Sequence, residues 1–214
     1  MSPLSLAFIV GGALFGVAAD RLAVRWPEHD EEHPAGRAIG WRTLATAAMG
    51  GFAGWLFVER FGASTPLVQA TFGLWFIALV VGFAVDLDQR LLPDELTLPF
   101  IAIGAVLGVA GQNPFIGDSL LVTAILAVVI PGAIYLASIP FGAGAFGLGD
   151  VKLLIGAGLM TGFVRAFTGL LAGLFAAGVV LAILLAARRI DRRTFVPFGP
   201  FLIFGALWGL VVRS

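Results

Sequence analysis

The sequence predicts an all-α fold, in which one membrane-embedded domain (1–214) is a bundle of about eight transmembrane helices. Hydrophobic residues make up 59% of the 214 positions, charged residues only 12%, and the mean hydropathy is +1.01. Soluble domains carry about 25% charged residues, so this composition indicates a surface that faces lipid. The formal net charge of zero gives no reason to expect a nucleic-acid partner.

Charged residues, glycines and prolines divide the chain into eight apolar segments. A helix needs about 20 apolar residues to cross a bilayer, within a range of about 17 to 25. We expect spans at 3–19, 43–58, 67–85, 96–111, 119–139, 150–160, 163–187 and 200–212. The first has no basic flank before it and no cleavage site after it, which favours a retained helix over a signal peptide. The sixth is the shortest.

The lysines and arginines support eight crossings, because they divide ten to three between the two sides of the membrane. One side holds Arg21, Arg25, Arg37, Arg42, Arg90, Lys152, Arg188, Arg189, Arg192 and Arg193, and the other holds Arg60, Arg165 and Arg213. The positive-inside rule then predicts a multi-pass protein of the inner (plasma) membrane with both termini outside the cytoplasm. Without the sixth span, the basic cluster at 188–193 would move to the outer face. The segment 20–42 becomes a short cytoplasmic loop.

Few side chains in the loop 20–42 suggest chemistry. The chain has no cysteine, which excludes disulfides, thiol catalysis and cysteine zinc sites. His29 and His33 share this loop with acidic residues at 28 and 30–32, and their spacing alone does not exclude a metal. Solvated side chains explain the group more simply, as they explain Asp20 at the end of the first span. We therefore expect no metal and no cofactor.

Two aspartates differ from the other acids because each lies where an apolar helix meets the cytoplasmic face. Asp86 ends the third span, seven positions before Pro93. Asp150 begins the sixth span after the glycine-rich segment 142–149, where glycines allow another backbone to approach closely. The predicted topology places both acids on the same face. A simpler interpretation of Asp150 is a helix cap.

Two carboxyl groups near one membrane face indicate acid/base activation of water, since the chain offers no serine–histidine or cysteine–histidine pair for hydrolysis. Like charges at close range cannot both ionise easily, so such a pair would share one proton. Asp86 ends a helix and Asp150 begins one, and the helix dipole favours a carboxylate at the beginning. We therefore expect Asp150 to be the base and Asp86 the acid.

These segments resemble those of the type IV prepilin peptidases, the GxGD aspartyl proteases of peptidase family A24. In that family the first catalytic aspartate precedes a proline after six intervening residues, as Asp86 precedes Pro93. The second ends the GxGD box, which matches 147–150 and is followed by Val-Lys-Leu-Leu. Segments 12–22 and 195–202 are similar to the opening and closing spans of the family.

The resemblance implies a membrane endopeptidase with Asp86 and Asp150 as its catalytic pair. Its substrates would be pilin-like precursors of pili or protein secretion, cut after a glycine that ends their short basic leader, at the cytoplasmic membrane face. Positions expected to bind substrate or shape the loops are Gly147, Gly149, Lys152 and Pro93. Lys152 either steadies the Asp150 anion or meets lipid phosphate. Gly144 stands where the family often has an acidic residue.

Many bacterial members of this family also methylate the new N-terminus with S-adenosylmethionine, and carry a larger cytoplasmic insert with zinc-binding cysteine pairs. The corresponding loop 20–42 is short and free of cysteine. We therefore expect a peptidase-only form. Two alternatives remain: a presenilin-like GxGD protease that cuts inside the bilayer, and a small transporter whose two aspartates bind protons or cations.

Overall fold

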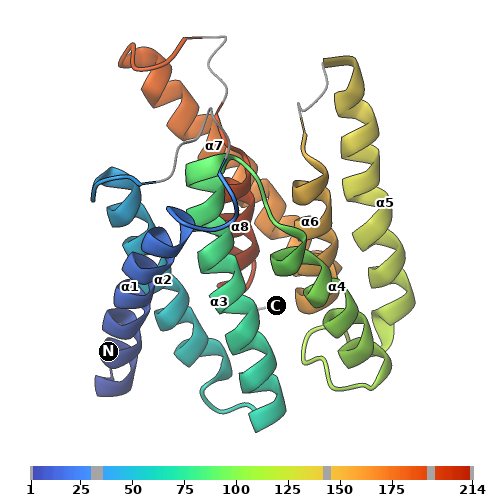
Figure 1. The fold of residues 1–214 in the computed structure, drawn as a ribbon. Coiled ribbons are helices and arrows are strands. Elements are labelled where there is room, and N and C mark those ends of the chain that lie inside the picture. Colours follow the sequence, from blue (N-terminus) through green and yellow to red (C-terminus); the bar gives the residue numbers. More distant parts are fainter. Residues whose placement is uncertain (1, 30–35, 142–145, 192–195, 213–214) are drawn as a thin grey trace.

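The computed structural model describes residues 2–29, 36–141, 146–191 and 196–212, which form eight α-helices and no strand within these ranges (Figure 1). The helices are α1 (Pro3–Ala23), α2 (Trp41–Phe61), α3 (Pro66–Gln89), α4 (Asp94–Val109), α5 (Leu120–Ser138), α6 (Leu148–Thr161), α7 (Phe163–Ala186) and α8 (Gly199–Trp208), with 3₁₀ turns at Gly117–Ser119 and Ile139–Phe141. The predicted all-α bundle is confirmed. Of the described helices, α1, α3, α5 and α7 are long and apolar enough to cross a bilayer, and crossing by the other four stays a prediction.

Several predicted boundaries were wrong, and the third helix, expected to end at 85, continues through Asp86 to Gln89. The loop expected at 20–42 is shorter, because α1 continues through Asp20 to its end at Ala23 and α2 begins at Trp41. The sixth helix begins at Leu148, two residues before Asp150. The last helix ends at Trp208 rather than at 212.

Helix α3 lies at the centre of the bundle, between the α1–α2 pair and α4 (Figure 1). In the most apolar stretch of α3, 72% of the residues are buried, against 22% in α1, 17% in α5 and 22% in α7. A helix that is apolar on all sides suits a position enclosed by other helices. Aromatic rings fix one end of this core, where Phe72 of α3 stacks on Phe61 of α2 with ring centroids 4.5 Å apart.

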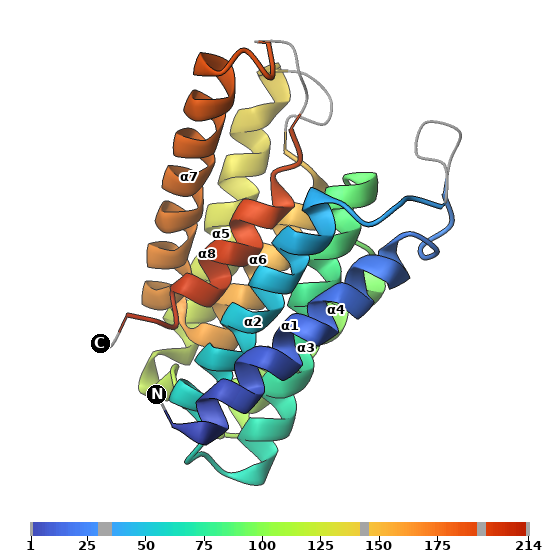
Figure 2. The same ribbon diagram turned by 90° about the vertical axis from the view of Figure 1, so that its left-hand side faces the viewer.

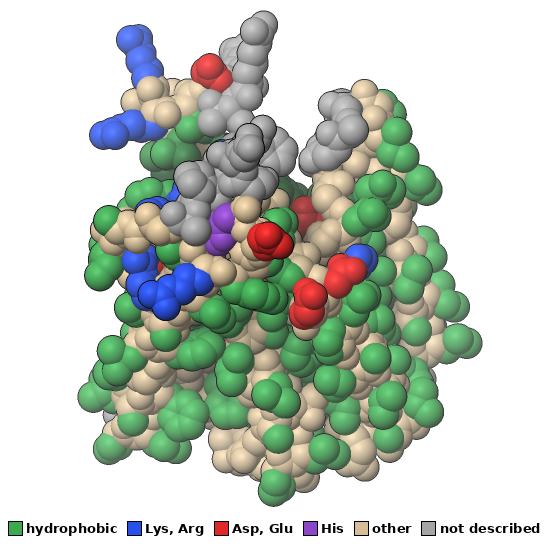
Figure 3. Space-filling model, in the orientation of Figure 1, with side chains coloured by type: hydrophobic (Ala, Val, Ile, Leu, Met, Phe, Trp, Pro, Cys, Tyr) green, Lys and Arg blue, Asp and Glu red, His purple; other side chains and the backbone are tan. Residues whose placement is uncertain are grey.

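The molecular surface separates into an apolar part and a charged part. On the face shown in Figure 3, acidic and basic side chains gather towards one end, while hydrophobic side chains cover the rest. The exposed leucines, isoleucines and valines of α1, α5 and α7 belong to this apolar part. This division is the one expected for a bundle whose charged end meets water and whose apolar walls meet lipid.

Glycines let α1 and α2 pack with their backbones in direct contact, and the two helices run side by side in Figure 2. A Cβ atom added to Gly50 would overlap the carbonyl oxygen of Gly12, and one added to Gly12 would overlap that of Gly50. Gly169 of α7 and Gly205 of α8 form a second pair of the same kind. In lipid the hydrophobic effect does not drive helices together, and the close packing that small residues allow stabilises the helix pair instead.

We predict that Gly50→Ala lowers the free energy of unfolding by about 2 kcal/mol, because the added methyl group must push α1 and α2 apart. Thermal unfolding of the purified protein in detergent measures the change. The matched control is Gly11→Ala, one position from Gly12, since a Cβ atom there would meet nothing within 4 Å. Equal stability of the two variants would contradict the close packing.

Candidate active site

Asp86 lies in the last turn of α3, and its side chain is almost fully enclosed. Only 4% of the residue is exposed. Its main-chain oxygen accepts a hydrogen bond from the N–H of Arg90 at 3.0 Å, and Arg90 ends the helix in a left-handed conformation with φ of 57°. Pro93 then precedes the first residue of α4 in an extended conformation. The spacing from Asp86 to Pro93 therefore covers one helix end, one turn and one helix start.

Asp150 is the third residue of α6 and is partly exposed. Its Oδ2 accepts the N–H of Gly147, the residue just before the helix, at 3.3 Å. In a capping box, the acidic side chain at the third helical position accepts a hydrogen bond from the N–H of the residue before the helix, and Asp150 makes this bond. The capping role considered for Asp150 is thus present, and it leaves the other carboxylate oxygen available.

Two positions without a side chain bring the segments that carry these acids together. A Cβ atom at Gly199, the first residue of α8, would lie 2.8 Å from both Cγ and Oδ2 of Asp86. A Cβ atom at Gly149 would lie 3.0 Å from Cβ of Leu92, in the turn that follows Asp86. The end of α3 and the starts of α4, α6 and α8 therefore converge at one end of the bundle.

This convergence places Asp86 and Asp150 close enough for their charges to interact. Oδ2 of Asp86 is buried and has no hydrogen-bond partner among the described residues. Buried polar atoms in folded proteins are nearly always paired, and exceptions are concentrated at functional sites. Asp150 accepts a backbone N–H, and Asp86 has a buried oxygen without a hydrogen-bond partner among the described residues. Two such carboxyl groups are suited to proton transfer to and from a bound molecule.

Lys152, predicted to steady Asp150 or to meet lipid, has a different partner. Its Nζ donates to Oδ1 of Asp94 at 2.6 Å, which links α6 to the first residue of α4. The side chain of Asp94 is 54% exposed and that of Lys152 is 30% exposed, so water screens the pair and it adds little stability. The ion pair joins the two helices that begin beside the acids.

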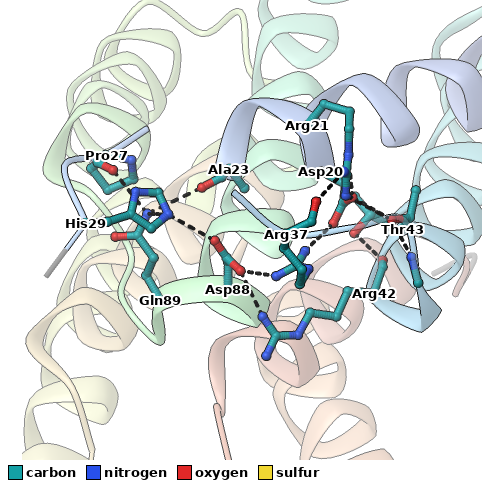
Figure 4. A network of polar contacts seen from close by, with 12 residues as sticks. Asp20, Arg21, Ala23, Pro27, His29, Arg37, Arg42, Thr43, Asp88 and Gln89 are labelled. Atoms are coloured by element: carbon teal, nitrogen blue, oxygen red, sulfur yellow. Dashed lines mark hydrogen bonds and ion pairs between the residues drawn. The ribbon is translucent and has the colours of Figure 1, made fainter. Parts of the chain in front are cut away.

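A buried polar network lies next to the site, where the sequence suggested solvated side chains (Figure 4). Asp20 is only 1% exposed, and it accepts hydrogen bonds from Nη2 of Arg37 at 2.8 Å and from Oγ1 of Thr43 at 2.6 Å. It also pairs with Arg21, its neighbour in α1. The expectation that Asp20 is solvated was wrong, because three side chains replace water around its carboxylate.

The same network reaches Asp88, two residues after Asp86. Arg37 pairs with Asp88 as well as with Asp20, and Nη1 of Arg42 donates to Asp88 at 2.8 Å. His29, with 6% of its side chain exposed, lies with Nε2 3.2 Å from Oδ2 of Asp88, so it too is not solvated as expected. The described part of the loop between α1 and α2 is thereby attached to the end of α3.

No group of three or more metal-binding side chains is found within the described ranges. His33, Gly144 and the acidic residues 30–32 lie outside the described residues. Gly199 and the buried network are the features that sequence reasoning missed. The glycine between Phe198 and Pro200 was the available signal, but its segment was interpreted only as similar to the closing span of the family.

Comparison with known proteins relates the chain to one family. The sequence model of the type IV leader peptidase family matches residues 71–187, a range that contains both Asp86 and Asp150. The prepilin leader peptidase/N-methyltransferase of Pseudomonas aeruginosa is 31% identical over 78% of this chain and 57% of its own length. Proteins of the same name are 29% identical in Stutzerimonas stutzeri, over 78% of this chain and 57% of the relative, and 28% identical in Legionella pneumophila, over 77% and 56%. The chain thus spans little more than half the length of these curated relatives. No solved structure matches it.

We predict that Arg37→Ala lowers the free energy of unfolding by about 2 kcal/mol, because Asp20 and Asp88 each lose a charged hydrogen-bond donor. Thermal unfolding in detergent measures this loss. Arg25→Ala is the matched control, since Arg25 is exposed and has no ion pair within the described part of the chain. If both variants unfold at the wild-type temperature, the network does not stabilise the fold.

Proposed function

Because the chain belongs to the type IV leader peptidase family, we propose that it is a membrane aspartyl endopeptidase that removes the leader of type IV pilin-like precursors. Asp86 and Asp150 are its catalytic pair. The observation that supports this most directly is the convergence of both acids at one end of the bundle, through Gly149 and Gly199. The family match over 71–187 also favours this function over a presenilin-like protease or a transporter.

In this proposal the two carboxyl groups have different roles. Asp150 is the base: the N–H of Gly147 and the start of α6 both favour its carboxylate form. Asp86 is the acid: it lies in the last turn of α3, it is buried, and its Oδ2 is free to donate a proton to a substrate carbonyl. Asp150 takes a proton from water as the water oxygen attacks the carbonyl carbon, and Asp86 protonates the carbonyl oxygen. When the C–N bond breaks, Asp150 gives its proton to the leaving nitrogen, and a hydroxyl group of the intermediate returns a proton to Asp86 as the carbonyl re-forms.

We also propose that the acids face the cytoplasm. Eight of the ten basic residues predicted on that side are described, and they lie at or beside the helix ends that surround the acids: Arg21, Arg25, Arg37, Arg42, Arg90, Lys152, Arg188 and Arg189. Arg60 and Arg165 lie near the opposite ends of α2 and α7. Arg192, Arg193 and Arg213 are outside the described residues. This distribution supports cleavage at the cytoplasmic membrane surface.

We predict that Asp86→Asn and Asp150→Asn each reduce leader removal by about 10³-fold or more, because the pair acts as a unit. Co-expression with a pilin-like precursor and separation of the processed form on gels measures the loss. The control is Glu59→Gln, an acid whose only side-chain partner among the described residues is Ser5 of α1, away from the site. Cleavage undisturbed in both aspartate variants sinks the proposed function.

The same variants assign the two roles. In infrared spectra near neutral pH, the band of a protonated carboxyl group should vanish in Asp86→Asn and persist in Asp150→Asn. The opposite pattern exchanges acid and base.

Mass spectrometry of the processed product tests the peptidase-only expectation, since a methylated N-terminus with this chain as the sole enzyme would show that it also transfers methyl groups.

We predict that Gly199→Ala reduces cleavage by about 100-fold, because the new methyl group displaces the carboxyl of Asp86 from its position. The rate of leader removal at equal protein level is the measurement. Gly178→Ala in α7 is the matched control, since a Cβ atom there would meet nothing within 4 Å. Equal activity of both variants would show that the contact between Gly199 and Asp86 does not position the acid.

A further inference from the structure

A large apolar cavity lies beside the candidate active site. Its volume is about 670 Å³, and its lining comes from α5, α7 and the residues just before α6 and α8. Ile134 and Ala137 form one wall, and Leu170 and Leu174 form the other. We call it the α5–α7 groove. Its size lies within the range of about 300 to 1,000 Å³ found for pockets that hold ligands.

The groove begins next to the two acids. Phe146, which precedes the GxGD box, and Phe198, which precedes Gly199, both line it. Their rings meet edge to face with centroids 6.3 Å apart. Gly199 in turn contacts the carboxyl of Asp86. One aromatic ring of the groove therefore lies four positions before Asp150, and the other lies next to the glycine that contacts Asp86.

From this end the groove continues away from the acids along α6. A second, smaller cavity is lined by Ile130 and Pro131 of α5, Leu154 of α6 and Leu170 of α7. Leu170 lines both cavities, so they share a wall. In Figure 1, α5 and α7 stand on either side of α6, with their long axes along the bundle. The apolar surface thus extends in the direction in which a membrane-spanning helix would run.

The walls of the groove are open to lipid. Both α5 and α7 are long and apolar enough to cross a bilayer, and both are mostly exposed in the structure. Leu174 is 42% exposed, and Ala137 is also exposed. A segment that enters this groove can therefore come sideways from the membrane and keep its other faces in lipid.

We propose that the α5–α7 groove receives the hydrophobic segment that follows the scissile bond of a membrane-anchored precursor. The proposal rests on the proposed leader-peptidase function. In a precursor anchored by the segment after the scissile bond, the chain runs from the acids into the membrane, and the groove is an apolar surface that leads from the acids in that direction. An apolar helix lying in such a groove would anchor it with side chains from one face.

Cysteine cross-linking tests the position of this segment, and the absence of native cysteine makes a single new one unambiguous. Leu174→Cys or Ala137→Cys is combined with Asp150→Asn, so that the precursor stays uncleaved. The precursor carries one cysteine in its hydrophobic segment, and copper phenanthroline is the oxidant. We expect a disulfide-linked complex with both groove positions. Leu171→Cys, on the same helix and 50% exposed but outside the groove, should give none.

The chain with native Asp150 is first tested for cleavage of the same precursor. If the native chain cleaves the precursor but neither groove position forms cross-links above the Leu171→Cys level, the proposed role of the groove is wrong and the proposed function stands. Failure of the native chain to cleave any pilin-like precursor overturns the proposed function, and the groove with it. The two failures are therefore distinguishable.

A second measurement uses a variant in which a larger side chain fills part of the groove. Leu174→Trp should slow cleavage of the membrane-anchored precursor by about tenfold, the effect of overpacking one side chain, while Leu171→Trp does not. A soluble peptide that ends shortly after the scissile bond should be cleaved by Leu174→Trp at the wild-type rate, which also shows that the variant is folded. Wild-type cleavage of the anchored precursor by Leu174→Trp contradicts the proposal.

Discussion

Carboxyl groups are costly to hold in apolar surroundings, and the architecture of this bundle is organised around that cost. The two acids of the candidate site lie at helix ends, where the chain leaves the apolar core. Asp86 is buried there because α8 begins directly against it, and Gly199 allows this contact since it has no side chain. Any side chain at position 199 would displace the carboxyl group of Asp86. The site is thus held by close backbone packing, which is also the means by which α1 packs on α2.

The other buried acids are treated differently. Asp20 and Asp88 are neutralised in place by arginines, and Arg37 contacts both of them. Such a network satisfies every charge it contains, so it is suited to fixing a loop rather than to accepting a substrate. Oδ2 of Asp86 has no hydrogen-bond partner among the described residues, although Asp88 is only two positions away. A buried carboxylate oxygen without a hydrogen-bond partner thus distinguishes the candidate catalytic acid from the structural carboxylates.

Much of this could be predicted from the sequence, because helices in lipid follow from runs of apolar residues. The eight helices and the place of Asp86 and Asp150 at helix ends are of this kind. What failed were features set by contacts between distant positions. The first helix extends past Asp20 because Arg37 and Thr43 satisfy that acid, and no local pattern announces such a partner. The contact between Gly199 and Asp86 joins residues more than a hundred positions apart, and the partner of Lys152 proved to be Asp94 on another helix.

Three helices begin around the acids: α4 after Pro93, α6 after Gly147 and α8 at Gly199. Each start carries partial positive charge from backbone N–H groups that its own helix does not use. A carboxyl pair that shares one proton keeps a single negative charge, and reaction at a peptide carbonyl develops another on oxygen. The only lysine of the chain is already paired with Asp94, so the main chain, together with the charge of Arg90, compensates for these charges. The contribution of the three helix starts depends on helix direction rather than on any ionisable group, and it keeps its sign at every pH at which the bundle stays folded.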